Sequence, residues 1–190
     1  MLTIALNNEN LTFHTDPSLF SPGGLDPGTA AMLSCASVTN TDKVLDLGCG
    51  YGVVGIYLAR LIGSEQVTLC DIDPIAIRLA RQNSQINQVS GVRIIQSDGF
   101  NQIDDTGYTL ILSNPPYHTD FSVAKHFIEK GFNRLALGGK MLMVTRRKKW
   151  YKEKFISVFG GVKIIEKDGY YVFIAEKRSR LYAAKTRGNK

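Results

Sequence analysis

Three aspartates stand where apolar, strand-like runs give way to turns. Asp46 opens the glycine-rich run "DLGCGYG", Asp71 ends "QVTLCD", and Asp98 lies in "QSDGF". Taken singly, each is most often a turn or cap residue. At successive strand ends of a parallel sheet, however, they would share the edge where ligands bind, with Asp71 on ribose hydroxyls and Asp98 on an adenine amine. Asp46 would repel a pyrophosphate and suit a cation. Together they predict a site for an adenosine with a positive charge and no phosphates.

A second set of residues, "SNPPYH", follows the apolar run "YTLIL". Consecutive prolines end a strand abruptly, because each removes a backbone donor and fixes φ. The side-chain carbonyl of Asn114 and the backbone carbonyl of Pro115, held in direction by Pro116, are two acceptors for the N–H groups of a delocalised amine. The ring of Tyr117 offers a face on which a planar substrate stacks. For His118 two interpretations stay open, a substrate contact or a cap of the following loop.

Strand and helix signals alternate along the rest of the chain. Residues 2–6 and 11–15 flank the polar turn "NNEN", which predicts an N-terminal β-hairpin. Asp26-Pro27 and Asp73-Pro74 each combine a helix cap with a first-turn proline. Continuous apolar strands separated by helices predict a parallel sheet covered on both faces, and the Lys-Asp-Gly turn near the end predicts an antiparallel last strand. The expected strands are 43–48, 66–71, 92–97, 108–113, 138–145 and two within 162–177, and the expected helices are 52–62, 73–87, 120–135 and 146–159.

Composition excludes several classes of protein. The chain has 190 residues, of which 44% are hydrophobic and 21% charged, as in an ordinary globular domain with a real core. No apolar run approaches the roughly 20 residues needed to span a bilayer, and the first residues do not resemble a signal peptide. Three cysteines, Cys35, Cys49 and Cys70, lack Cys-x-x-Cys spacing, which favours a reducing cytoplasm over a disulfide framework or a cysteine-built metal site. We expect a cytoplasmic protein with no metal.

Charge is distributed unevenly along the chain. Residues 140–190 hold 15 Lys and Arg against 4 Asp and Glu, whereas residues 1–139 hold 8 against 13. Such asymmetry suggests a polyanionic partner, although a solvated basic surface explains it equally well at this point. Arg146, Arg147, Lys148 and Lys149 directly follow the fifth parallel strand, at the ligand-binding edge, and this position favours contact with nucleic acid phosphates.

The motifs "DLGCGYG", "LCDIDP", "SDGF" and "NPPY", in this order, resemble those of class I S-adenosylmethionine-dependent methyltransferases of the small-methyltransferase domain family. The resemblance covers roughly residues 20–177. It implies a Rossmann-like α/β fold with a seven-stranded, mostly parallel sheet and an antiparallel last strand, preceded here by the N-terminal hairpin. The glycine loop would face the methionine part of the cofactor. The cofactor-binding residues implied are Thr29, Asp46, Gly48, Cys49, Gly50, Asp71, Ile72, Asp98, Gly99 and Asn114.

Two stretches, "FSPGGLDPGTAAML" and "SNPPYH", further resemble the small-subunit ribosomal RNA methyltransferase C group, which modifies the exocyclic 2-amino group of a guanine. That resemblance implies catalysis by Asn114, Pro115, Pro116 and Tyr117, and a pocket walled by residues 20–29. Longer members carry a related N-terminal domain, whereas this chain resembles the short, single-domain members. We therefore expect a single domain over 1–190, with a hairpin extension at 1–19 and a basic tail at 178–190. The expected substrate-binding residues are Phe20, Tyr117, His118, Arg146, Arg147, Lys148 and Lys149.

Other functions remain open at the level of sequence. The same Asn-Pro-Pro-Tyr chemistry serves an RNA adenine amine or a glutamine amide of a release factor. A non-catalytic RNA-binding factor in ribosome assembly belongs to another class, and a dinucleotide-dependent oxidoreductase is opposed by Asp46 before the glycines. The expected partner is ribosomal RNA or the small ribosomal subunit, with no membrane. We expect a monomer and leave a homodimer open.

Overall fold

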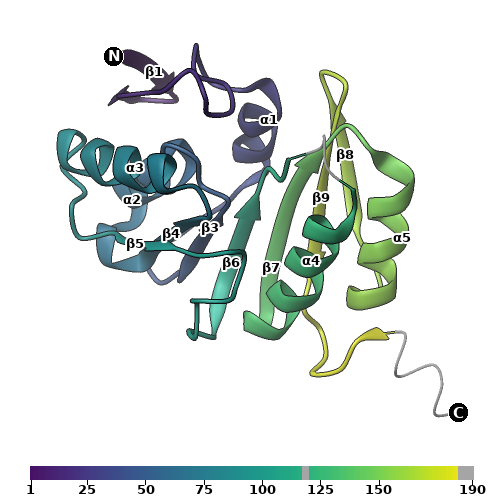
Figure 1. Ribbon diagram of the computed structural model, residues 1–190. Helices are drawn as coiled ribbons and strands as arrows, with labels where there is room; N and C mark the ends of the chain where they lie inside the picture. Colours follow the sequence, from purple (N-terminus) through teal and green to yellow (C-terminus); the bar gives the residue numbers. More distant parts are fainter. Residues whose placement is uncertain (117–119, 184–190) are drawn as a thin grey trace, which may run out of the picture.

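A seven-stranded sheet forms the centre of the computed structural model, which describes residues 1–116 and 120–183 (Figure 1). The strand order is β5-β4-β3-β6-β7-β9-β8, and β9 alone runs against the other six. The predicted fold class, with its N-terminal hairpin and antiparallel last strand, is therefore confirmed. The strands are β3 (Val44–Leu47), β4 (Val67–Asp71), β5 (Arg93–Gln96), β6 (Tyr108–Ser113), β7 (Leu135–Thr145), β8 (Lys163–Lys167) and β9 (Tyr170–Glu176), and the separate hairpin comprises β1 (Leu2–Leu6) and β2 (Glu9–Phe13).

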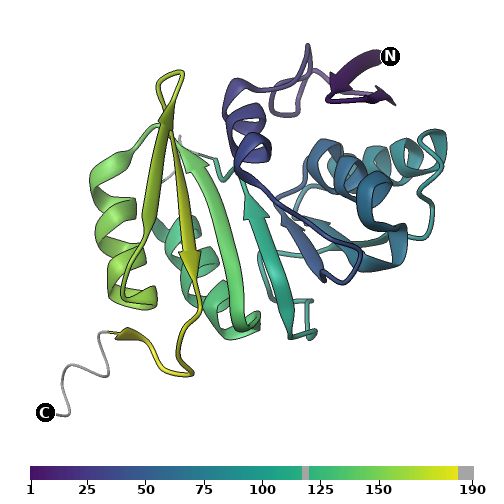
Figure 2. The same cartoon turned by 180° about the vertical axis from the view of Figure 1, so that it is seen from behind.

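Helices cover both faces of the sheet, and the sheet divides the core in two. One apolar cluster lies under α1, α2 and α3, and the other lies under α4 and α5, which stand in front of β7, β9 and β8 in Figure 1 and behind them in Figure 2. Both clusters consist of side chains from the continuous apolar strands, as expected for a parallel sheet. The helices are α1 (Pro27–Cys35), α2 (Val53–Ile62), α3 (Pro74–Ile86), α4 (Ser122–Arg134) and α5 (Lys148–Phe159), with a 3₁₀ turn at Ser64–Gln66.

Local sequence signals explain where these elements begin and turn. Asp26 caps α1 by accepting from the Thr29 N–H, and Asp73 caps α3 by accepting from the Ile75 N–H. Between β8 and β9, Asp168 and Gly169 have φ values of 51° and 77°, as a two-residue type I′ turn requires. Each of these turn and cap predictions is confirmed.

Several predicted boundaries differ from the structure by one to three residues. The first hairpin reverses within two residues, since Asn7 takes a φ of 51° and Leu6 pairs with Glu9, so β2 starts at 9 rather than 11. Strand β7 begins at Leu135 rather than 138, because its pairing with β6 resumes after a register shift. Helix α5 starts at Lys148 rather than 146. The last shift leaves the candidate residues Arg146 and Arg147 directly before the helix instead of within it.

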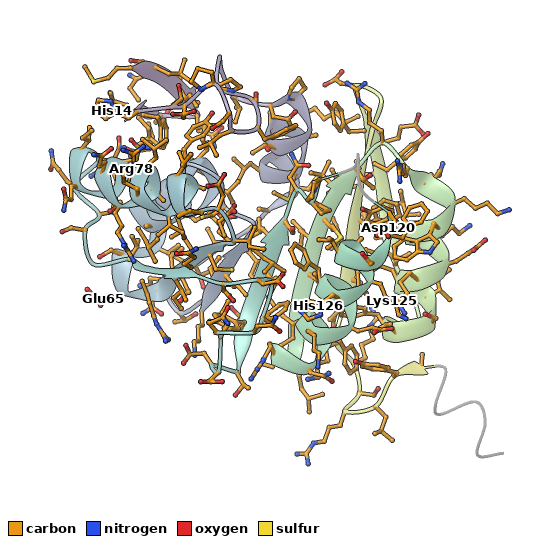
Figure 3. All side chains as sticks on the ribbon, viewed as in Figure 1. His14, Glu65, Arg78, Asp120, Lys125 and His126 are labelled. Carbon is orange, nitrogen blue, oxygen red and sulfur yellow. The ribbon has the colours of Figure 1, made fainter. Side chains whose placement is uncertain are left out.

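The N-terminal hairpin is attached to α3 by two asparagine side chains. Asn87 donates to the carbonyl of Thr12 at 2.8 Å and accepts from its N–H at 2.9 Å, and Asn83 bonds His14 in the same two-way manner at 3.0 and 2.7 Å. In Figure 3 His14 lies above α3 accordingly. This attachment fixes the start of the segment 15–26, which runs from the hairpin to α1 across the carboxyl edge of the sheet.

No helix among the described residues has the length and apolar character needed to cross a membrane.

Candidate active site

A cavity of about 380 Å³ opens at the carboxyl ends of β3, β4 and β6. It lies in the size range of small-molecule sites and at the edge where open α/β sheets bind ligands. Five aspartates line it, and no Lys, Arg or His is found among its described lining residues. The cavity is therefore suited to a ligand with hydroxyl, amine or cationic groups and unsuited to phosphates.

The structure brings most of the sequence-predicted site residues to this cavity. Tyr117 and His118 lie outside the described residues. Arg146, Arg147, Lys148 and Lys149 follow β7 and do not line the cavity. The predicted residues that do line it are Phe20, Thr29, Asp46, Gly48, Cys49, Gly50, Asp71, Ile72, Asp98, Gly99, Asn114, Pro115 and Pro116.

The glycine loop between β3 and α2 is fixed by bonds to β4. The N–H groups of Gly48 and Cys49 both donate to the Cys70 carbonyl at 2.9 Å, and the Gly50 N–H donates to Asp71 Oδ2 at 2.8 Å. Gly50 has a φ of 55°, and the place where a Cβ would stand is open space. Glycine thus permits both the left-handed backbone and the approach of a ligand to the loop.

The Asp46 carboxylate is buried beneath this loop and anchors α2. Its Oδ2 accepts from the Gly55 N–H at 2.8 Å, in the first turn of the helix. Burial, with a smaller contribution from the nearby Asp71 carboxylate, raises the pKa of Asp46 to about 7, although the Gly55 hydrogen bond opposes the shift. A neighbouring positive charge would stabilise its ionised form.

Asp71 and Asp98 form the opposite wall of the cavity. The two oxygens of Asp71 are oriented by backbone donors, Oδ2 by Gly50 and Oδ1 by the Asp73 N–H at 3.0 Å, and each keeps a lone pair. Asp98 is exposed at the cavity rim. Ile72 is 61% exposed there, which places an apolar side chain at the mouth of an otherwise acidic wall. This wall combines acceptors for hydroxyl groups with an apolar surface for a planar ring.

The cysteine thiols of the site are inert. Burial raises the pKa of Cys49 well above its usual value and that of Cys70 to about 12. Cys49 therefore faces the cavity as a thiol rather than a nucleophilic thiolate.

Asn114 stands at the end of β6 with its amide oriented by two acceptors. Its Nδ2 donates to Asp26 Oδ2 at 2.9 Å and to Thr29 Oγ1 at 3.0 Å. Because an ionised carboxylate only accepts hydrogen bonds, the amide nitrogen must face Asp26 and the carbonyl must face the other way. Asn114 Oδ1 is buried and has no hydrogen-bond partner among the described residues. A buried acceptor without a partner is rare, so Oδ1 is available to a ligand N–H in the cavity.

Asp26 is in turn held by the terminal hairpin, a link that sequence reasoning missed. Its Oδ2 also accepts from the Thr29 N–H at 2.8 Å, and Oδ1 lies 3.5 Å from the Tyr170 hydroxyl. Arg146 donates to that hydroxyl at 3.0 Å and lies over the Tyr170 ring. The sequence signal for Asp26, an aspartate before proline, indicates only a helix cap. Nothing in the sequence indicates that Tyr170, 144 positions away, contacts it.

Part of the cavity is covered by the segment before α1. The Tyr51 hydroxyl donates to the carbonyls of Ser21 and Gly24 at 3.1 and 3.3 Å, and burial raises its pKa to about 12, which keeps it a donor. Phe20, on this segment, is 50% exposed and lines the cavity. Its role as a substrate contact stays a prediction.

Comparison with known proteins places this geometry in context. The methyltransferase small domain family matches residues 10–175. A Bacillus subtilis protein, YbxB, of uncharacterised function, is 30% identical over 178 residues, which cover 90% of this chain and 89% of that protein. The ribosomal RNA small subunit methyltransferase C of Haemophilus ducreyi is 35% identical over 170 residues, covering 85% of this chain and 50% of that protein.

A solved structure shows the same arrangement of elements. A 16S rRNA N2 methyltransferase of T. thermophilus, in complex with AdoMet and guanosine, aligns with a TM-score of 0.84 at 26% identity, over 93% of this chain and 50% of that chain. The chain thus spans about half the length of the rRNA methyltransferase C relatives it matches.

Proposed function

The chain belongs to the methyltransferase small domain family, and from that premise we propose that it methylates the exocyclic 2-amino group of a guanine in small-subunit ribosomal RNA. The methyl donor is S-adenosylmethionine. One observation carries the proposal: a buried amide oxygen, Asn114 Oδ1, has no described partner and belongs to a residue that lines the cavity, where it would accept from an amine. The guanine rests on the 35% identical relative and on the structural match solved with guanosine.

The cavity residues fit this cofactor. Asp71 would accept from two ribose hydroxyls and Asp98 from the adenine amine, with Ile72 against the adenine ring; all three residues line the cavity. The bound cofactor supplies an activated methyl group on a positively charged sulfur. Asp46 and the glycine loop would hold the methionine part, where the buried carboxylate favours a cation. Without a basic side chain among its described lining residues, the cavity disfavours the pyrophosphate of a dinucleotide.

The chain activates the amine by accepting its hydrogens. A guanine 2-amino group is a poor nucleophile because its lone pair is delocalised into the ring. Asn114 Oδ1 and the carbonyl of Pro115 would each accept one N–H, which pulls the nitrogen toward tetrahedral geometry and localises the lone pair. As positive charge develops on the nitrogen, both hydrogen bonds strengthen, so they stabilise the transition state more than the ground state.

Asp26 and Thr29 prepare this acceptor before the substrate arrives. They hold Asn114 Nδ2 at 2.9 and 3.0 Å, so the carbonyl is oriented without reorganisation during the reaction. The stacking role of Tyr117 and the two roles of His118 stay predictions. The substituted nitrogen loses its remaining extra proton to water, so no strong general base is needed.

The partner and the domain organisation are proposals as well. We infer that ribosomal RNA or the small subunit approaches along the basic segment 146–149, in the cytoplasm. Residues 1–190 would act as one methyltransferase domain with a hairpin extension and a basic tail. Its expected state is a monomer.

Transfer of a labelled methyl group tests the function directly. Small subunits, naked small-subunit rRNA, tRNA and release factor are offered in parallel with labelled S-adenosylmethionine, and the products are digested. We expect label in 2-amino-methylated guanosine from small-subunit rRNA, at a rate that Asn114→Ala lowers by about tenfold or more. Label in adenosine or in glutamine would overturn the substrate. No label on any acceptor, with the cofactor bound, would favour a non-catalytic RNA-binding factor.

A further inference from the structure

A second hollow opens beyond the cavity, where α4 and α5 begin. Its described lining residues are Phe121, Arg147, Lys148, Lys149, Trp150 and Glu153, and we call it the α4–α5 hollow. Figure 3 places Asp120, directly before Phe121, near the upper ends of these two helices. The hollow combines aromatic rings with three cations and one carboxylate.

Two aromatic rings lie face to face in the hollow. Phe121 and Trp150 are stacked, with ring centroids 4.3 Å apart and planes 12° apart. Tyr151 packs edge-on against both rings, and the Arg147 guanidinium lies 5.1 Å from the centre of the Phe121 ring. Both stacked rings are only partly buried. Partly exposed rings held in a fixed orientation provide a stacking surface for a nucleobase.

The three cations stand at the N-terminal end of α5, where positive charge is unfavourable as long as no ligand is bound. Arg147 is the N-cap of α5, Lys148 and Lys149 open its first turn, and no acidic residue lies in that turn. Helix N-termini carry partial positive charge and unpaired N–H groups, so cations there are unfavourable and anions are favoured. The Arg147 side chain does not cap the helix, and Glu166 lies 3.8 Å from Lys148 in an exposed pair. This arrangement is what a bound phosphate would stabilise.

The α4–α5 hollow lies close to Asn114. Strands β6 and β7 are neighbours, with Ser113 paired to Met143, so Asn114 and Arg146 leave the same edge of the sheet. Phe121 follows Pro116, which lines the active-site cavity, by five residues, a span of at most about 18 Å. A nucleic acid with its target base in the cavity therefore reaches the hollow with a neighbouring nucleotide.

We propose that the α4–α5 hollow is a subsite for a nucleotide flanking the target base in single-stranded RNA. Its base stacks on the Phe121–Trp150 pair, and its phosphate is bound by Arg147, Lys149 and the N-terminus of α5. This subsite rests on the proposed function insofar as the substrate is RNA. It assigns the affinity for the strand to residues outside the methyl-transfer site.

Trp150 makes the test direct, because it is the chain's one tryptophan. Its fluorescence is measured while a single-stranded oligoribonucleotide is added to the full chain with S-adenosylhomocysteine present. We expect saturable quenching whose dissociation constant rises with salt. Phe121→Leu and Lys149→Gln should each weaken binding about fivefold or more. Lys152→Gln is the matched control, because Lys152 is exposed on the same helix outside the hollow, and should change binding less than about twofold.

Three results would contradict the subsite, and none of them would decide whether the protein methylates rRNA. Binding of end-labelled RNA with no change in Trp150 fluorescence would place the strand elsewhere. An equal loss of RNA affinity in Lys149→Gln and Lys152→Gln would show that binding depends only on the overall positive charge. Equal affinity for duplex and single-stranded RNA would show that no base stacks on the aromatic rings. Methylation of rRNA alongside any of these keeps the proposed function. Hollow-dependent RNA binding with label only on glutamine would keep the subsite and end the proposed function.

Discussion

Replacing Asn114 with alanine should lower turnover sharply while the chain still folds and binds S-adenosylmethionine. The substitution removes Oδ1, a buried oxygen that has no described partner, and leaves Asp26 and Thr29 without their shared donor. The walls formed by Asp71 and the glycine loop are untouched. We therefore expect the affinity for the cofactor to stay within about threefold of wild type.

The size of the loss follows from the strength of one hydrogen bond. A hydrogen bond between neutral groups contributes about 1 kcal/mol, and one to a charged group about 1.5–3 kcal/mol. As the amine becomes positive, its hydrogen bond to Oδ1 strengthens by the difference between these two values. Alanine also leaves the buried N–H of the amine unpaired, which costs about 1–3 kcal/mol. The combined loss of about 1.5–5 kcal/mol corresponds to a decrease of about 10- to 5,000-fold in kcat/KM.

Asp26→Ala separates orientation from direct contact. Without the carboxylate, the Thr29 hydroxyl can accept from Nδ2 or donate to Oδ1, so two amide orientations become similar in energy. Loss of orientation alone halves the reactive population, about a twofold effect, and looser positioning extends it to at most about tenfold. Loss of the helix cap should lower stability by about 1 kcal/mol.

The assay is methyl transfer to whichever acceptor the labelled-methyl experiment identifies, with cofactor affinity from calorimetry and folding from thermal unfolding. Turnover of Asn114→Ala within threefold of wild type, at unchanged cofactor affinity, would refute the acceptor role of Oδ1. An equal loss in Asp26→Ala would show instead that the carboxylate acts on the substrate itself.

Two further predictions concern a buried charge and two helix glycines. Because burial raises the pKa of Asp46 to about 7, from 3.8 when unfolded, its contribution to stability falls as pH rises from about 4 to 7. Calorimetry should show S-adenosylmethionine, which is cationic, binding up to about tenfold tighter at pH 8 than at pH 6. The affinity for S-adenosylhomocysteine, which has a neutral sulfur, should change less with pH. Asp46→Asn should abolish the pH dependence of S-adenosylmethionine binding. Gly55→Ala should lower the melting temperature by about 2–8 °C, because its Cβ would stand 2.4 Å from buried Leu69. Gly131→Ala, whose Cβ would meet the flexible end of Met141 at 3.2 Å and Phe100 at an ordinary contact distance of 3.7 Å, should be neutral or stabilising in the same thermal scan.

The sequence predicted those parts of the fold whose signals are local. Asp26-Pro27 and Asp73-Pro74 start helices because cap and proline act within one turn. Asp168-Gly169 makes its turn for the same reason. The position of β9 between β7 and β8 depends on pairing between distant segments, which no local pattern encodes. The early start of β7 at Leu135 likewise follows from its pairing with β6 across a register shift.

The candidate site shows the same division between local and distant signals. Asp46, Asp71 and Asp98 were found because each ends an apolar strand, and a parallel sheet brings such ends together. The role of Asp26 in orienting Asn114 was missed, because its local signal is fully explained by the cap. The sequence gives no reason to assign Tyr170 to the site, because an apolar terminal strand predicts only that its tyrosine packs in the core, where it is buried.

The uneven charge of the chain becomes intelligible once the two ligands are considered together. A cationic cofactor favours carboxylates, and five aspartates line the cavity without a described basic side chain. An RNA strand requires cations, and Arg147, Lys148 and Lys149 line the neighbouring hollow. Carboxylates near the strand would repel it, and lysines in the cavity would repel the sulfonium, so the two signs must be separated at one sheet edge. The chain separates them by topology: three of the carboxylates, Asp46, Asp71 and Asp98, stand at the ends of β3, β4 and β5, whereas the cations follow β7. On the proposed function, the amine would be methylated at the boundary between an acidic pocket and a basic surface.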